Sequence, residues 1–173
     1  MKTGIVIGSF DAFHNGHRDL LLYGLGLFDR LVVEISDHPQ KKNWFTGEER
    51  REMMLSAMED QAHRLEVHYN VNGLRDLGEI CRTYDAYHIL RGVKAGRTVD
   101  EELHLQNVYR FIVKETTGIH LEFVYNLTSD ADFRGSSLVK VYANDKDILR
   151  KLVPDALVDS IYERGRMINA QKN

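Results

Sequence analysis

The chain has 173 residues, a length that favours one domain with its own hydrophobic core. Hydrophobic residues make up 43% of it, charged residues 28%, and no apolar run approaches the roughly 18 residues that a membrane helix needs. The formal net charge of −3 argues against nucleic-acid binding, and the single cysteine excludes a disulfide framework or a cysteine zinc site within the chain. The first residues lack the pattern of a signal peptide. We therefore expect a cytoplasmic protein whose partners are neither nucleic acids nor membranes.

Short β-like runs alternate with helical patterns along the chain, which indicates βαβ units and a parallel sheet. We predict a Rossmann-like, doubly wound α/β fold with about five parallel strands, as a single domain over residues 1–173. Its core spans about 4–143, followed by a helical segment at about 147–164. Strands are predicted at 4–7, 31–36, 65–69, 88–90 and 121–125, and helices at 17–28, 46–60, 73–84, 99–115, 136–144 and 148–164.

Helix-capping residues support these assignments. Thr46 and Glu49 have the spacing of a capping box, in which each side chain bonds the other residue's backbone N–H. Gly135 or Ser136 is expected to cap the next-to-last helix, and Asp147 the last one.

The most informative stretch is Gly8-Ser-Phe-Asp-Ala-Phe-His-Asn-Gly-His17, between the first strand and the first helix. A helix N-terminus presents unpaired backbone N–H groups and a partial positive charge, which favour phosphate binding. His14 and His17 add donors that could follow charge as it develops on a phosphate. Neither a Walker A pattern nor a G-x-G-x-x-G fingerprint is present, so nucleotide binding is expected to depend on this turn.

Four motifs in chain order resemble those of a known enzyme family. His14-Asn-Gly-His17 resembles the (T/H)-x-G-H motif of the nucleotidyltransferase superfamily, and residues 41–50 resemble its lysine-bearing segment after the second strand. Arg91-Gly-Val-Lys-Ala95, with acidic residues at 100–102, and Ser136-Ser-Leu-Val-Lys140 are similar to elements of bacterial phosphopantetheine adenylyltransferases. The resemblance implies transfer of AMP from ATP to 4′-phosphopantetheine, releasing dephospho-CoA and pyrophosphate in coenzyme A synthesis. It also implies Mg²⁺ as cofactor with ATP, and a homo-oligomer, commonly a hexamer.

By the same resemblance, His17 and Lys41 are the expected catalytic residues. His17 would stabilise the α-phosphate in the transition state, and Lys41 would orient the attacking phosphate. No direct metal ligand is predicted in the chain. The expected phosphopantetheine-binding residues are Ser9, Lys41, Leu77 and Arg91. The expected ATP-binding residues are Ser9, Phe10, His14, Gly16, His17, Gly92, Val93, Lys94, Glu102, Ala131, Asp132, Phe133, Arg134, Gly135, Ser136 and Ser137.

Two alternative functions stay open. His14 makes the motif H-x-G-H, as in cytidylyltransferases, so the nucleotide could be CTP or the phosphate acceptor a different one. The chain could also be a non-catalytic nucleotide-binding module of the same fold. Such a module would bind ATP without releasing pyrophosphate.

Overall fold

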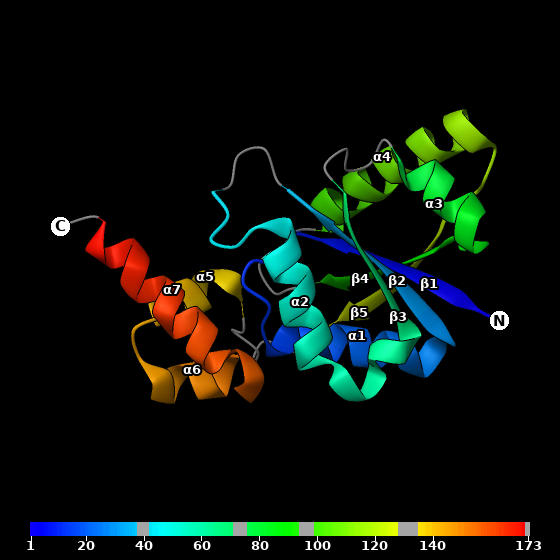
Figure 1. The fold of residues 1–173 in the computed structure, drawn as a ribbon. Helices are drawn as coiled ribbons and strands as arrows, with labels where there is room; N and C mark the ends of the chain where they lie inside the picture. The colour runs from blue at the N-terminus through cyan, green and yellow to red at the C-terminus, as the bar shows by residue number, and fades with distance from the viewer. Residues whose placement is uncertain (38–41, 71–75, 94–98, 128–134, 172–173) are drawn as a thin grey trace.

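A five-stranded sheet forms the centre of the molecule, seen in a computed structural model that describes residues 1–37, 42–70, 76–93, 99–127 and 135–171 (Figure 1). The strands lie in the order β3-β2-β1-β4-β5, and every neighbouring pair is parallel. This arrangement confirms the predicted α/β class, and each predicted strand is present. The strands are β1 (Thr3–Gly8), β2 (Arg30–Ser36), β3 (Leu65–Asn70), β4 (His88–Val93) and β5 (Glu122–Leu127).

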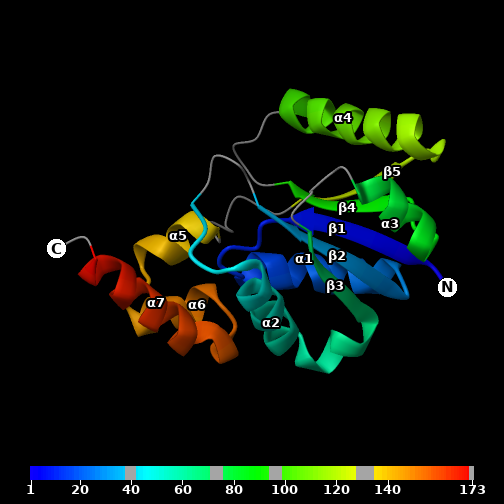
Figure 2. The same ribbon diagram turned by 45° about the horizontal axis from the view of Figure 1, so that its top comes forward.

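Helices cover both faces of the sheet (Figures 1 and 2). On one face lie α1 (Asn15–Leu27) and α2 (Gly47–Ala57), and on the other lie α3 (Leu77–Tyr84) and α4 (Val99–Thr117). Each layer has its own hydrophobic core, and the side chains of β1 alternate between the two, with Val6 in the first and Ile5 in the second. Strands buried on both faces carry continuous apolar runs, which is why the sequence pattern located them well.

Helix α1 packs very closely on the sheet at Gly24. A Cβ placed there would lie 2.5 Å from a methyl group of Leu90 on β4 and 3.0 Å from one of Leu31 on β2. Glycine therefore lets the helix backbone approach the two strands. This contact holds the C-terminal part of α1 against β2 and β4.

The C-terminal part differs from its prediction. In place of one helix at 148–164 there are α6 (Lys146–Leu152), a short 3₁₀ turn η3 (Asp155–Leu157) and α7 (Val158–Ala170). Pro154 causes the break, because it lacks a backbone N–H and forces the preceding Val153 into an extended conformation. The cap of α6 is Asp145, whose side chain accepts from the backbone of Asp147 and Ile148, so the assignment of Asp147 as cap is also wrong.

Other helix ends follow the sequence more closely. The capping box of Thr46 and Glu49 is present at the start of α2, with both reciprocal hydrogen bonds. The helix predicted over 46–60 is shorter, because α2 gives way to a 3₁₀ helix η1 (Glu59–Arg64). Helix α5 (Ser136–Val141) has Gly135 as its N-cap residue.

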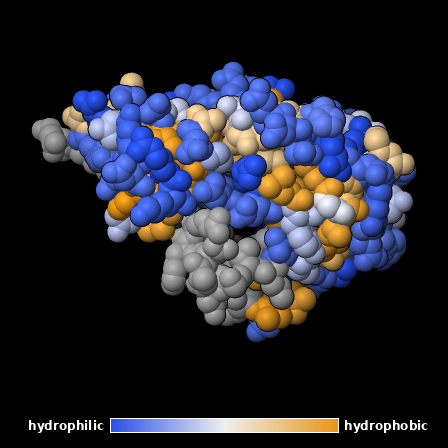
Figure 3. All heavy atoms as spheres, turned by 90° about the horizontal axis from the view of Figure 1, so that it is seen from below, coloured by the Kyte–Doolittle hydropathy of each residue, from blue (hydrophilic) through white to orange (hydrophobic). Residues whose placement is uncertain are grey.

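The described helices include none that is long and apolar enough to cross a membrane. On the face seen from below, hydrophobic residues reach the surface as separate groups between hydrophilic ones (Figure 3). In the described segments, the exposed large apolar side chains are likewise distributed over several elements, among them Tyr23 on α1, Phe111 on α4 and Met167 on α7.

One buried carboxyl group makes the stability of the fold depend on pH. Glu34 on β2 is only 4% exposed, and its burial, assisted by the charge of Asp76, raises its pKa to about 7 despite the opposing effect of the Asn70 side chain. The folded chain then holds a proton that the unfolded chain releases above about pH 4.5, so stability falls as the pH rises from 4.5 towards 7. We expect Glu34→Gln to raise the free energy of unfolding at pH 8 by about 2–3 kcal/mol.

Urea unfolding at pH 5 and pH 8 measures this effect. Glu66→Gln on neighbouring β3 is the matched control, since the Glu66 side chain is about half exposed (49%) and should leave stability nearly unchanged. If Glu34→Gln and the wild type showed the same pH dependence, Glu34 would not titrate in this range.

Candidate active site

Three segments far apart in the sequence meet at the carboxyl ends of the strands. They are the turn after β1, the segment 43–46 before α2, and the start of α5. Figure 2 shows the strand ends pointing toward the side of the molecule where α5 lies. Open parallel sheets bind their ligands at this edge. The three segments contain residues from three of the four motifs that were singled out in the sequence.

The two histidines of the turn stack on each other. His14 is fully buried at the N-cap position of α1, and its carbonyl accepts from the backbone N–H groups of His17 and Arg18. The rings of His14 and His17 lie 3.6 Å apart between centroids, nearly parallel at 23°. The edge of Phe10 meets the His17 ring at 4.9 Å on centroids. These contacts fix the orientation of His17 in the first turn of the helix.

Asp11 ties the turn to the other two segments. Its carboxylate accepts from the backbone N–H groups of Trp44 (2.9 Å) and Phe45 (3.0 Å) and pairs with the ammonium of Lys140 at 2.5 Å. The Lys140 ammonium also lies 5.5 Å from the ring centre of Trp44. Since Asp11 is almost fully buried, these donors offset the cost of burying its charge.

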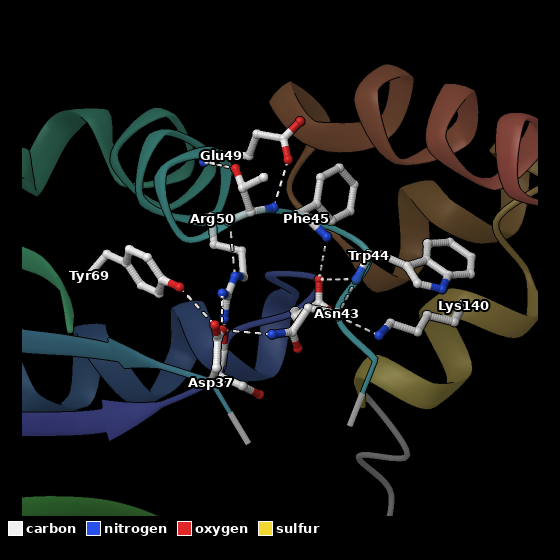
Figure 4. A network of polar contacts seen from close by, with 11 residues as sticks. Asp37, Asn43, Trp44, Phe45, Glu49, Arg50, Tyr69 and Lys140 are labelled. Carbon is white, nitrogen blue, oxygen red and sulfur yellow. Dashed lines mark hydrogen bonds and ion pairs between the residues drawn. The ribbon is translucent and has the colours of Figure 1, made fainter. Parts of the chain in front are cut away.

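Arg50 of α2 supports the same turn from beneath. Its guanidinium, 1% exposed, donates to the carbonyls of Thr46 (3.1 Å) and Ser9 (2.8 Å) and to Asp37 (2.5 Å) (Figure 4). Asp37 also accepts from Tyr69 and Asn43 at 2.7 Å each. Burial acts to raise the pKa of Asp37, but the hydrogen bonds from Tyr69 and Arg50 outweigh it and hold that pKa below its usual value. The carboxylate therefore stays ionised and keeps Arg50 in place.

A cavity of about 110 Å³ opens where the three segments meet. That is far below the roughly 300–1,000 Å³ of a drug-sized ligand site, and suits a single phosphate-sized group better than a whole nucleotide. Its lining combines hydroxyl groups, an amide and an ammonium group, which suit phosphate oxygens, with the carboxylate of Asp11, which is paired with that ammonium. The lining residues are Ser9, Asp11, Asn43, Ser136, Ser137 and Lys140.

Arg91, at the carboxyl end of β4, is paired with Glu102 of α4. Its Nε lies 2.9 Å from Oε2 of Glu102 and its Nη2 lies 3.3 Å from Oε1, a two-point contact between fork and carboxylate. Both side chains are largely buried. In the sheet, β4, which carries Arg91, and β2 flank β1 on opposite sides.

The structure brings together Ser9, Ser136 and Ser137 around the cavity, and it stacks His17 on His14 at the start of α1. Gly92 lies against Leu20 of α1, while Leu77 is buried in the core between the sheet and α3. The expected contact of Leu77 with an acceptor would therefore require it to leave that core. Six predicted site residues fall outside the described residues: Lys41, Lys94, Ala131, Asp132, Phe133 and Arg134.

Three polar residues of the cavity had no role in the sequence-based prediction, namely Asp11, Asn43 and Lys140. Each lies inside one of the motifs described above, but the sequence alone does not show that the three contact one another. Arg50 is the last residue of the lysine-bearing segment, and the sequence alone gives it no role of its own. Full burial is rare for an arginine and indicates that Arg50 organises the structure around it.

Metal ligands are sparse in this region. Among the described residues there is no group of three or more His, Cys, Asp or Glu side chains placed to hold a metal ion. Magnesium is commonly held by one or two carboxylates together with substrate phosphates, so a cation carried by a nucleotide would need few ligands from the chain.

Comparison with known proteins adds a consistent picture. The cytidylyltransferase-like family model matches residues 5–126. A phosphopantetheine adenylyltransferase of Desulfotalea psychrophila is 31% identical over 95% of this chain and 94% of its own length, and one of Anaeromyxobacter sp. is 31% identical over 94% of both. The relative from Streptococcus pyogenes is 27% identical over 92% of this chain and 94% of its own.

A solved structure shares the fold at low sequence identity. It is a bifunctional NMN adenylyltransferase/ADP ribose pyrophosphatase of Francisella tularensis, complexed with AMP and a manganese ion. The TM-score is 0.56 at 15% identity, over 83% of this chain and 42% of that protein. At this identity the likeness concerns the fold alone.

Proposed function

This chain belongs to the cytidylyltransferase-like family and is a nucleotidyltransferase, and we propose that it transfers AMP from ATP to 4′-phosphopantetheine. The products would be dephospho-CoA and pyrophosphate. The relatives named phosphopantetheine adenylyltransferase, which align over nearly the whole chain, support this choice of substrates. The structural observation that carries the proposal is the phosphate-sized cavity between the turn after β1 and the start of α5.

In the proposed reaction an oxygen of the acceptor phosphate attacks the α-phosphorus of ATP. The new P–O bond forms as the bond between the α-phosphorus and the bridging oxygen breaks, and pyrophosphate leaves with the electron pair. Such a transfer needs positioning and cationic stabilisation but no covalent intermediate.

The residues divide between the two ends of this reaction. Ser9, Ser136 and Lys140, which line the cavity, would hold phosphate oxygens there and stabilise the leaving pyrophosphate. His17, oriented by its contacts with His14 and Phe10, would donate to the α-phosphate. Arg91, at the carboxyl end of β4, would receive the acceptor phosphate together with Lys41.

We further propose Mg²⁺ as the cation carried by the triphosphate. Bound there, it would neutralise charge on the leaving group. The structural neighbour, aligned over 42% of its own length, was crystallised with AMP and a manganese ion. The chain's own contribution is the donor set of the cavity, in which the Asp11 carboxylate is already engaged by Lys140, Trp44 and Phe45.

The direct test is pyrophosphate release from ATP and Mg²⁺, measured with and without 4′-phosphopantetheine, and with CTP in place of ATP. We expect release only when ATP and the acceptor are both present. Release with CTP would identify the cytidylyl alternative. Tight ATP binding without release under any of these conditions would indicate a non-catalytic module and contradict the proposal.

Lys41→Ala should chiefly impair use of the acceptor, since the lysine is proposed to share the charge of the attacking phosphate. We expect kcat/KM for 4′-phosphopantetheine to fall by about tenfold or more, with KM for ATP little changed. The adjacent Lys42, which is exposed, gives the control variant Lys42→Ala. A loss confined to ATP affinity would place Lys41 on the nucleotide instead.

A further inference from the structure

The pairing of Arg91 with Glu102 gives Glu102 a different role from the one its motif implies. By resemblance, Glu102 would contact ATP. In the structure both of its carboxylate oxygens instead receive N–H groups of Arg91, at 2.9 Å and 3.3 Å. The Glu102 side chain is 6% exposed and that of Arg91 is 12% exposed. This is an ion pair formed away from bulk water.

The helix that carries Glu102 is built to hold it over β4 and β5. The buried residues of α4 are Glu102, Gln106, Tyr109 and Val113, which follow one another at helical spacing on one face. The first two of these are polar, and they lie over polar partners. Arg91 on β4 and Tyr125 on β5 are neighbours in the sheet register, and the Tyr125 hydroxyl lies 2.6 Å from the side-chain amide of Gln106.

Charge and burial make this pair a fixed unit. A carboxylate as buried as Glu102 requires a cation and hydrogen bonds to stay ionised, and the guanidinium supplies both. The contact uses the Nε and Nη2 atoms of Arg91, which form one edge of the planar fork. The edge formed by Nη1 and Nη2 is a second pair of donors that faces away from Glu102, and such an edge matches two oxygens of a phosphate.

We propose that Glu102 is a positioning residue that acts through Arg91, setting the guanidinium so that its outer edge receives the acceptor phosphate. This inference rests on the proposed function, and it assigns Glu102 to the acceptor side of the site, not to the ribose or the metal of ATP.

The test uses Glu102→Gln, which keeps the size of the side chain but removes the charge that orients Arg91. We expect KM for 4′-phosphopantetheine to rise by about 10- to 100-fold, because a small misplacement of a binding group weakens its contact with substrate strongly. KM for ATP should stay within about twofold. Glu115→Gln, an exposed carboxylate farther along α4, is the control and should leave both constants unchanged.

A double-mutant cycle separates positioning from a general structural effect. Arg91→Gln should raise the acceptor KM at least as much as Glu102→Gln, and the double variant should be no worse than Arg91→Gln alone. Thermal unfolding of each variant reports the folded fraction, to which rates are normalised.

Additive losses, or a rise in the KM for ATP with Glu102→Gln, would overturn the inference while leaving the proposed reaction intact. Absence of phosphopantetheine-dependent pyrophosphate release by the wild type would overturn the proposed function and this inference with it.

Discussion

His17→Ala is expected to lower kcat by at least about 10²-fold while the affinity for ATP changes by less than about twofold. The reason is the restricted position of the ring. It is stacked on His14 at 3.6 Å and met by Phe10 at 4.9 Å, so its donor is held in one orientation at the start of α1. A fixed donor gains most as negative charge builds up on the α-phosphate, which occurs in the transition state and not in bound ATP.

Steady-state kinetics and calorimetric titration with ATP measure the two effects separately. His63→Ala is the matched control, because His63 is exposed in η1, which follows the C-terminal end of α2, whereas the turn contacts residues at the start of α2. Circular dichroism should show that the variant is folded, since His14 keeps its N-cap position through backbone contacts. Equal losses of ATP affinity and turnover would mean that His17 binds the ground state, and would contradict its proposed role.

Arg50→Ala is expected to destabilise the fold by about 3 kcal/mol or more. The guanidinium is fully buried and donates to three acceptors, so its removal leaves a cavity and deprives the Ser9 carbonyl of its donor. Asp37 would also lose its buried cation, although it keeps Tyr69 and Asn43 as donors. Urea unfolding measures the change in free energy.

Two further variants make this prediction specific. Arg166→Ala removes an arginine from the surface of α7, where the side chain is 63% exposed, and should cost less than about 0.5 kcal/mol. Arg50→Lys keeps the charge but cannot reach three acceptors with one ammonium group, so most of the loss should persist. A change below 1 kcal/mol in Arg50→Ala would show that the network around Asp37 contributes little to stability.

The sequence predicted the sheet well because of where its strands lie. Strand β2, for example, is covered on both faces, and its sequence contains the continuous apolar run 31–33 followed by Ile35. An apolar run this short between two helical patterns indicates a strand, because helices are longer. The C-terminal helix was predicted less well. Helical periodicity continues through 148–164, and the break depends on a single proline whose effect on the chain direction is local.

The site was predicted in its parts but not in its connections. The order of the motifs indicates that Ser9, His17 and Ser136 belong to one region, because each lies in a segment that follows the carboxyl end of a predicted strand. The pairing of Asp11 with Lys140, 129 residues away in sequence, depends on how α5 packs against the turn. Likewise, the resemblance assigned Arg91 and Glu102 to different substrates, whereas packing of α4 on β4 pairs them directly.

The strand order has a consequence for synthesis of the protein. The first strand made, β1, becomes the middle of the sheet, with β2 on one side and β4 on the other. A nascent chain that has reached Asn70 contains β1, β2 and β3 but leaves the full edge of β1 without a partner until β4 emerges. Because that edge presents the unpaired backbone N–H and C=O groups of Gly4, Ile5 and Val6, which pair with β4 in the finished sheet, a chain truncated between these points would be prone to pair with other chains.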